Sequence, residues 1–263
     1  GEQFMVNLII SPILYHDTIT GFRGIAIDIS KRVKLEQDLL FRDKLLHAIT
    51  LSTQELLKTE ALETSLAAAL EILGKAIDVD RVYFFTNNLD AQNTVQSVSQ
   101  KTGWYKEGTA SDFYSSDHQN VPASAIKLFL DPLKNHKPFI ASTASLEKSL
   151  TKQLLLKQKT KSILILPIFV REVFLGFISF DDCRKERLWS TTERDLLKVF
   201  ATSVAETIER KEAEKESKLL YDNLIEDLNM AQKIQTYILP PWYKKQHPFM
   251  FSSNYLPWEK IGG

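Results

Sequence analysis

The sequence predicts an α+β fold in which strands joined as hairpins pack with long helices. Three observations lead to this class. Stretches with apolar residues three and four positions apart, as in a helix, alternate with short runs of β-branched and aromatic residues. Two of these runs, "KSILILPIFV" and "EVFLGFISFDD", are apolar at odd and even positions and are joined by a tight turn, so we expect central strands covered on both faces. A very long helical pattern then closes the folded region.

The first expected elements are a hairpin and a helix. Residues 4–14 and 21–29 are β-rich runs separated by the turn-prone "HDTIT". A lone hairpin is marginal in water, so this pair should belong to a larger unit. Its second run passes directly into a helical pattern in which Val33, Leu46 and Leu56 recur at helical spacing.

A second helix is expected from near Thr59, followed by a second hairpin and an irregular segment. Its stripe has the width of a core-facing helix and consists of Leu62, Leu66, Ala69, Leu73 and Ile77. The runs "RVYFFT" and "TVQSVSQ" then flank a turn signal. Residues 103–161 are irregular, with short helical pieces expected near Pro122 and Glu147.

The last helix should start at a capping box, because Ser190 and Glu193 can each satisfy a free backbone amide of the first turn. After Ile208 the helix becomes charge-rich, and its narrow apolar stripe suits a coiled-coil seam better than a domain core. We therefore predict a homodimer through this seam. The predicted interface residues are Leu220, Leu224, Leu228, Ile234 and Ile238.

The amino-acid composition is typical of a globular protein. Its 263 residues favour one or two domains. Hydrophobic residues make up 44% and charged residues 25%, which indicates a soluble protein with a packed core. Lys plus Arg equal Asp plus Glu, 33 each, so no net field favours nucleic acid or an anionic membrane as a partner.

Cysteine and histidine usage points to no disulfide and no metal site. The single Cys183 cannot form an intramolecular disulfide and fits a reducing compartment. His118, His136 and His247 have no partners at metal-ligand spacing. No apolar run approaches the ~20 residues of a membrane-spanning helix, and no signal peptide is visible. We therefore expect a cytoplasmic protein.

The order of helix, hairpin, irregular segment and final helix resembles a GAF domain over about residues 40–210. The most specific part is "LPI-x6-LG-x-ISFD" around Pro167 to Phe180, followed by "W-x4-R-DLL". The resemblance implies an antiparallel sheet with the first and last helices on one face and a small-molecule pocket on the other. The signature of cyclic-nucleotide GAF domains is not visible, so the ligand is unknown.

Aromatic residues of the irregular segment are the candidate ligand-binding residues, because small-molecule sites are concave and mostly apolar. A place in the core is an equally good reading of the same residues. The candidates are Trp104, Phe113 and Phe139.

Both ends resemble parts of other domains. "GFRGIAIDISKRVKLEQDLL" is similar to the close of a PAS domain, with Asp28, Ile29, Ser30 and Arg32 in the matching positions. "AQKIQTYILPP" and "NYLPWEKIGG" resemble the entry to a bacterial metal-dependent Ser/Thr phosphatase domain of the RsbU and SpoIIE type, although Trp258 stands where a small residue is common. The resemblance implies that Mn²⁺ or Mg²⁺ would be bound only by aspartates beyond Gly263, so this segment is not expected to be an enzyme.

These resemblances divide the chain into parts. We expect the end of a PAS domain at 1–30, a linker helix at 31–42, a GAF domain at 43–210, a coiled-coil signalling helix at 211–238 and the start of a phosphatase domain at 239–263. The first hypothesis is a sensory segment that relays small-molecule or upstream PAS input through the coiled coil to a catalytic domain. The alternative is a ligand-free dimerisation scaffold that only positions effector domains.

Other reactive side chains have simpler interpretations. His47 is expected in the core or an interface, because it lacks the acidic and basic partners of a phospho-accepting histidine. Cys183 is interpreted as a surface or packing thiol. Asp181, Asp182 and Glu186 are interpreted as a solvated hairpin end, so no catalytic constellation is predicted.

Overall fold

The computed structural model describes residues 4–15, 17–58, 61–109, 118–238, 243–246 and 248–252. By its contacts the chain divides into two units, Gly1–Thr207 and Ile208–Gly263, which are described separately. Within the described residues, no helix is long and apolar enough to cross a lipid bilayer.

The centre of the first unit is a six-stranded antiparallel sheet in the order β5-β4-β3-β8-β7-β6. Its strands are β3 Arg81–Leu89, β4 Val95–Tyr105, β5 Val121–Pro122, β6 Phe139–Ser142, β7 Ser162–Val170 and β8 Val173–Asp182. The two strongly apolar runs form β7 and β8, inside the sheet. Their predicted central position is therefore confirmed, and so is the α+β class.

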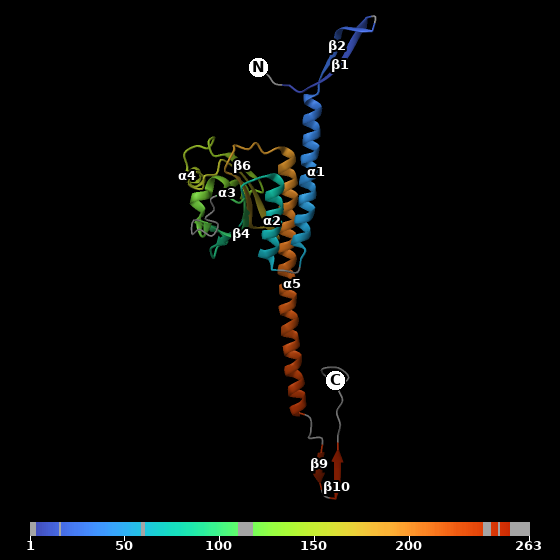
Figure 1. Ribbon diagram of the computed structural model, residues 1–263. Coiled ribbons are helices and arrows are strands. Elements are labelled where there is room, and N and C mark those ends of the chain that lie inside the picture. Colours follow the sequence, from blue (N-terminus) through green and yellow to red (C-terminus); the bar gives the residue numbers. More distant parts are fainter. Residues whose placement is uncertain are drawn as a thin grey trace. The chain divides into compact units, whose positions relative to one another are not determined.

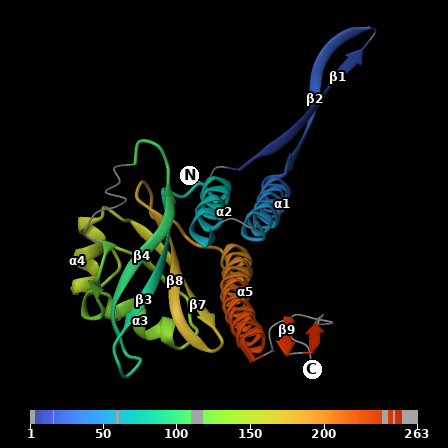
Figure 2. The same ribbon diagram turned by 90° about the horizontal axis from the view of Figure 1, so that it is seen from below.

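Helices cover both faces of this sheet (Figure 2). On one side α2 (Leu62–Ile77) and the first part of α5 (Thr191–Ile238) lie on the sheet, and α1 (Ser30–Leu56) packs against α2. The other face carries the short elements η2 (Ala123–Ile126), α3 (Lys127–Lys134) and α4 (Leu150–Lys157). The layers match the arrangement that the resemblance implied.

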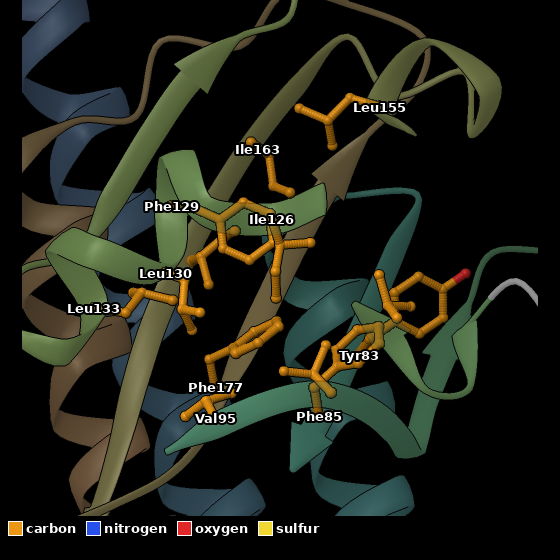
Figure 3. Packing of buried hydrophobic residues seen from close by; sticks show 13 residues of the cluster. Tyr83, Phe85, Val95, Ile126, Phe129, Leu130, Leu133, Leu155, Ile163 and Phe177 are labelled. Carbon is orange, nitrogen blue, oxygen red and sulfur yellow. The ribbon is translucent and has the colours of Figure 1, made fainter. Parts of the chain in front are cut away.

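Each face of the sheet therefore has its own core. Under the long helices the fully buried side chains include Leu66, Leu73, Phe180 and Phe200. Between the sheet and α3 lies a second cluster, whose side chains point toward one another in Figure 3. Burial of apolar area contributes about 25 cal/mol per Å², so both clusters stabilise the fold and hold the strands in register.

The irregular segment contains more strand than the sequence predicted. β4 continues to Tyr105, so Gly103 and Trp104 belong to the strand and not to the turn that follows it. Glycine is needed at position 103, because the Cβ of any other residue there would lie 2.5 Å from Val82 O. β5 and β6 were not predicted, since two and four residues are too few for a visible period.

The N-terminal part of the first unit is the predicted hairpin, β1 (Val6–Tyr15) and β2 (Thr18–Asp28). Its strand feeds directly into α1: Ser30 N–H donates to Asp28 Oδ1 at 2.9 Å, and Ser30 Oγ accepts from Met5 N–H at 2.8 Å. The apolar side chains of this hairpin, such as Ile10 and Phe22, are exposed.

α5 starts at the predicted capping box. Ser190 N–H donates to Glu193 Oε2 at 2.7 Å, and Glu193 N–H donates to Ser190 Oγ at 3.2 Å. The helix is continuous to Ile238 (Figure 1). In the second unit it is followed by a short antiparallel hairpin of β9 (Tyr243–Gln246) and β10 (Phe249–Ser252).

Candidate functional site

A cavity of about 40 Å³ lies between the sheet and the helices α3 and α4. Successive side chains of a strand point to opposite faces of the sheet. The odd-numbered residues of β3, β7 and β8 therefore face the cavity, and the even-numbered ones face the long helices. Its walls are mostly apolar. The lining residues are Tyr83, Phe85, Val98, His118, Val121, Ile126, Phe129, Leu154, Leu155, Gln158, Ile163, Ile165, Phe177, Ser179 and Asp181.

Aromatic rings from the sheet and from α3 line the cavity. Phe85 and Phe177 stack with their ring centroids 5.0 Å apart, and Phe129 meets Phe177 edge-on at 5.5 Å. Figure 3 shows these rings together, with Tyr83 on the same strand as Phe85. The ring of His118 lies 5.3 Å from that of Tyr83. This wall suits the apolar body of a small molecule.

One end of the cavity is polar, and its central group is the carboxyl of Asp181. This side chain is only 4% exposed. Its Oδ2 lies 3.4 Å from Arg81 Nη2 and 3.4 Å from Thr160 Oγ1, both at the limit of hydrogen bonding. Its Oδ1 is buried and, among the described residues, has no hydrogen-bond partner. Burial raises the pKa of Asp181 above its ordinary value, against the opposing effects of the Arg81 charge and of side-chain hydrogen bonding with Ser179 and Thr160.

Arg81 is buried beside this carboxyl, at 5% exposure. Its Nη2 donates to Thr160 Oγ1 at 2.7 Å and to the backbone oxygen of Gln158 at 3.0 Å. These stronger bonds hold the guanidinium at the start of β3, where it ties that strand to the turn after α4. The polar end of the cavity therefore rests on a buried pair of opposite charges.

A separate ionic cluster closes the end of β8. Asp80 Oδ2 accepts the backbone N–H of Cys183 at 2.7 Å and of Arg184 at 3.1 Å, while Arg184 Nε lies 2.6 Å from Asp80 Oδ1. Burial raises the pKa of the Cys183 thiol to about 11, so the thiol is protonated at neutral pH and a poor nucleophile. This cluster is structural.

The interpretation of the "FDD" stretch as a solvated hairpin end was wrong for both aspartates. Asp181 and Asp182 are 3% and 0% exposed. Asp181 faces the cavity, whereas Asp182 Oδ1 accepts the backbone N–H groups of Arg184 and Lys185 at 3.1 and 3.0 Å. The feature of the sequence that could have indicated a buried Asp181 is Arg81, an unusual charged residue at the start of an apolar strand.

The structure separates the predicted ligand-binding residues. Trp104 lies on the face covered by the long helices, where a Cβ built on Gly74 of α2 would be 2.2 Å from its ring. Phe139 packs beside Phe129, with ring centroids 5.8 Å apart, behind the cavity wall. Phe113 lies outside the described residues. Neither Trp104 nor Phe139 is among the cavity's described lining residues, and ligand contact by any of the three stays a prediction.

The predicted seam residues lie on α5 in the second unit. Leu220, Leu224 and Ile234 are 71%, 54% and 54% exposed, and Leu228 is half-buried. Ile238 ends the helix. Pairing through this stripe stays a prediction. In the described part of the chain, no three His, Cys, Asp or Glu side chains are grouped as a metal site would require.

Comparison with known proteins places the cavity in a sensor fold. The GAF domain family matches residues 61–208. The chain is 33% identical over 187 residues to the methanogenesis regulatory histidine kinase FilI of Methanothrix harundinacea (strain 6Ac), an alignment that covers 71% of this chain and 21% of the relative. The chain thus spans about a fifth of the length of that curated relative.

Solved structures agree on the fold. The phycocyanobilin-bound GAF domain from a cyanobacterial phytochrome is 19% identical with a TM-score of 0.54, and the match covers 66% of this chain and 96% of that one. A bacteriophytochrome from the photosynthetic bacterium R. palustris is 13% identical with a TM-score of 0.56, and 72% of this chain and 42% of that one are covered. At these identities the likeness shows the fold alone.

Proposed function

Because the chain belongs to the GAF domain family, which residues 61–208 match, we propose that it senses a small molecule and relays the signal along α5 to an output domain. The family membership and the histidine kinase relative support a GAF domain with a sensory and regulatory role in signal transduction. The ligand, the relay and the output domain are the proposal.

The observation that carries the proposal is the continuity of α5. The helix contributes Phe200 and Val204 to the core under the sheet, and the same helix exposes Leu220 and Leu224 further along. A narrow apolar stripe on a charged helix gains little stability alone. We propose that two copies pair in parallel through this stripe, so that a change in the core alters the pairing.

The relay would be a population shift between two packings of the helix pair. Such a shift requires a ligand that binds one packing better than the other. Sheet strands β3 and β8 connect the two faces of the domain: Phe177 faces the cavity and the next residue, Ile178, faces the long helices. Displacement of these strands by a ligand is therefore the shortest physical route from the cavity to the α5 core.

We propose a metal-dependent Ser/Thr phosphatase of the RsbU and SpoIIE type as the output domain. The support is the resemblance of residues 231–241 and 254–263 to the entry of that domain. The relative FilI is a histidine kinase, so output of that class is the competing expectation. The reading frame after Gly263 tests the choice: a metal-binding aspartate directly after the Gly-Gly pair supports the phosphatase, and a nucleotide-binding kinase domain contradicts it.

One observation favours the ligand-free scaffold as a second candidate function. Phe85, Phe129 and Phe177 fill most of the space under α3 and leave only about 40 Å³. Native mass spectrometry of the purified chain, before and after mild denaturation, separates the two functions. The sensor predicts a dimer whose mass falls by that of a released small molecule, whereas a scaffold predicts a dimer with no mass change. A monomer would contradict both.

A further inference from the structure

The most informative unused group in the molecule is Asp181 Oδ1. It is a buried oxygen of a side chain that lines the cavity and, within the described part of the chain, it accepts no hydrogen bond. The second oxygen of the same carboxyl makes two long contacts of 3.4 Å, with Arg81 and Thr160. A buried acceptor without a donor is strongly unfavourable, and native proteins rarely leave one. The cavity therefore has a place for a donor.

Charge selects the kind of donor. Arg81 already faces Asp181 across the β3–β8 pair, so with Asp181 ionised this buried pair carries no net charge. A cationic ligand would add a second positive charge beside Arg81, and an anionic one would meet the carboxylate. Either charge would be desolvated without a partner of its own. An uncharged N–H or O–H group can donate to Oδ1 without this penalty.

The volume and the other lining residues of the cavity limit the size and the polarity of the ligand. A water molecule needs about 10–15 Å³ of such a cavity, so about 40 Å³ holds about three waters, or one molecule of three or four non-hydrogen atoms. The rings of Phe85 and Phe177 line the same cavity, four positions along β3 and β8 from Arg81 and Asp181. These rings offer no charge and favour an apolar group.

We propose that this cavity binds a compact uncharged molecule, of the small amide or alcohol class, which donates one hydrogen bond to Asp181 Oδ1 and places its apolar part against Phe85 and Phe177. The inference rests on the proposed sensory function and names the chemistry of its ligand. It is independent of the identity of the output domain.

The test uses four probes of matched size: acetamide and ethanol, which are uncharged, and acetate and ethylammonium, which are charged. Amide NMR spectra of the full chain are recorded during titration with each probe. We expect saturable shifts at Phe177, Ser179 and Asp181 with acetamide, and at least tenfold weaker binding of both charged probes. No saturable shift with either uncharged probe, or tighter binding of a charged one, overturns the proposal.

Variants then test the carboxyl itself. The double change Arg81→Met with Asp181→Leu removes both charges together, so neither is left unpaired, and it should weaken acetamide binding at least tenfold. The milder Asp181→Asn keeps an acceptor oxygen of lower charge and should weaken binding severalfold, which keeps the test valid if the double variant does not fold. Asp131→Asn on the exposed side of α3 is the control and should bind as the wild type does. Unchanged affinity in the Asp181 variants overturns the role of Asp181.

The same titration separates this inference from the proposed function. Spin labels on α5 report the pairing of the helix. If acetamide saturates the cavity and the label distances stay constant, the ligand chemistry stands and the relay fails. If no probe binds but a cavity-filling substitution changes the distances, the relay stands and the ligand chemistry fails.

Discussion

Arg81 and Asp181 are direct partners across the β3–β8 pair, and their side chains meet inside the protein with Arg81 Nη2 3.4 Å from Asp181 Oδ2. The two residues are 100 positions apart in the chain. The pair stands at the polar end of the cavity, so it links the stability of the sheet to the chemistry of the site.

Removal of one partner should be far more harmful than removal of both. Arg81→Met leaves the Asp181 carboxylate buried and unpaired, and a loss of about 3–5 kcal/mol in the free energy of unfolding is expected. Adding Asp181→Leu should restore a large part of that loss, because two apolar side chains need no partner. Urea unfolding of the wild type, both single variants and the double variant measures this coupling, and strictly additive effects would mean that the two charges do not interact.

This pair also marks the limit of what the sequence could predict. Alternation along "RVYFFT" and "EVFLGFISFDD" predicts two strands correctly, because the pattern is local. Whether Asp181 points to solvent or into the protein depends on the strand beside it, which lies far away in the sequence. Acidic residues at a strand end are usually solvated, so the local pattern favoured the wrong answer.

Trp104 illustrates the same limit. An aromatic residue in a segment without clear periodicity could line a pocket or join the core, and its side of the sheet follows only from the register of β4 on β3. By contrast, the hairpin, the capping box and the long final helix depend on neighbouring residues alone, and these were predicted with their positions nearly correct.

Gly74→Ala tests the position of Trp104 against α2. The added Cβ would lie 2.2 Å from the Trp104 ring. Overpacking of this kind costs about 1–3 kcal/mol, which over most of that range exceeds the gain of about 1 kcal/mol from replacing glycine in a helix. We expect net destabilisation in thermal unfolding, and no destabilisation by the same change in a Trp104→Leu background.

Gly24→Ala in β2 is the control for this change, because its Cβ would make only ordinary contacts, with Leu8 Cδ1 at 3.8 Å and Ile9 O at 4.0 Å. It should leave the melting temperature nearly unchanged. If Gly74→Ala were equally harmless in the wild type, Trp104 would not pack on α2 and its role in the pocket would have to be reconsidered.

Glu193 should make the domain sensitive to acid. Burial opposes ionisation of this carboxyl, but the bonds from Arg187 and from Ser190 N–H outweigh it and lower its pKa below 4.5. A lowered pKa in the folded state means that Glu193 stabilises the fold above about pH 4.5, and that this contribution is lost as the pH falls through the lower folded pKa.

Glu193→Gln removes this titration while keeping the amide oxygen for the capping box. Urea midpoints of wild type and variant should therefore differ most at neutral pH and converge below pH 4.5. A constant difference across the pH range would show that Glu193 does not titrate differently in the folded and unfolded states.

The seam of α5 should hold the dimer. Leu224→Asp with Leu228→Asp places charge on the narrow apolar stripe, which opposes its burial against a second copy. Sedimentation velocity should report a monomer, while the circular dichroism and melting of the sheet domain stay close to those of the wild type. A dimer that survives both changes would place the main contact elsewhere, most plausibly in α1.

The central claim, that the cavity controls the pairing of α5, is tested most directly by electron spin resonance distances between the two copies. Spin labels are attached at Lys218→Cys in a Cys183→Ser background. Leu155→Phe is added to fill the cavity. Leu188→Phe adds the same volume at a position that is 94% exposed and serves as the control. The sensor account predicts a changed distance distribution for Leu155→Phe and the parental distribution for Leu188→Phe. Identical distributions in folded, dimeric protein with and without Leu155→Phe would contradict it.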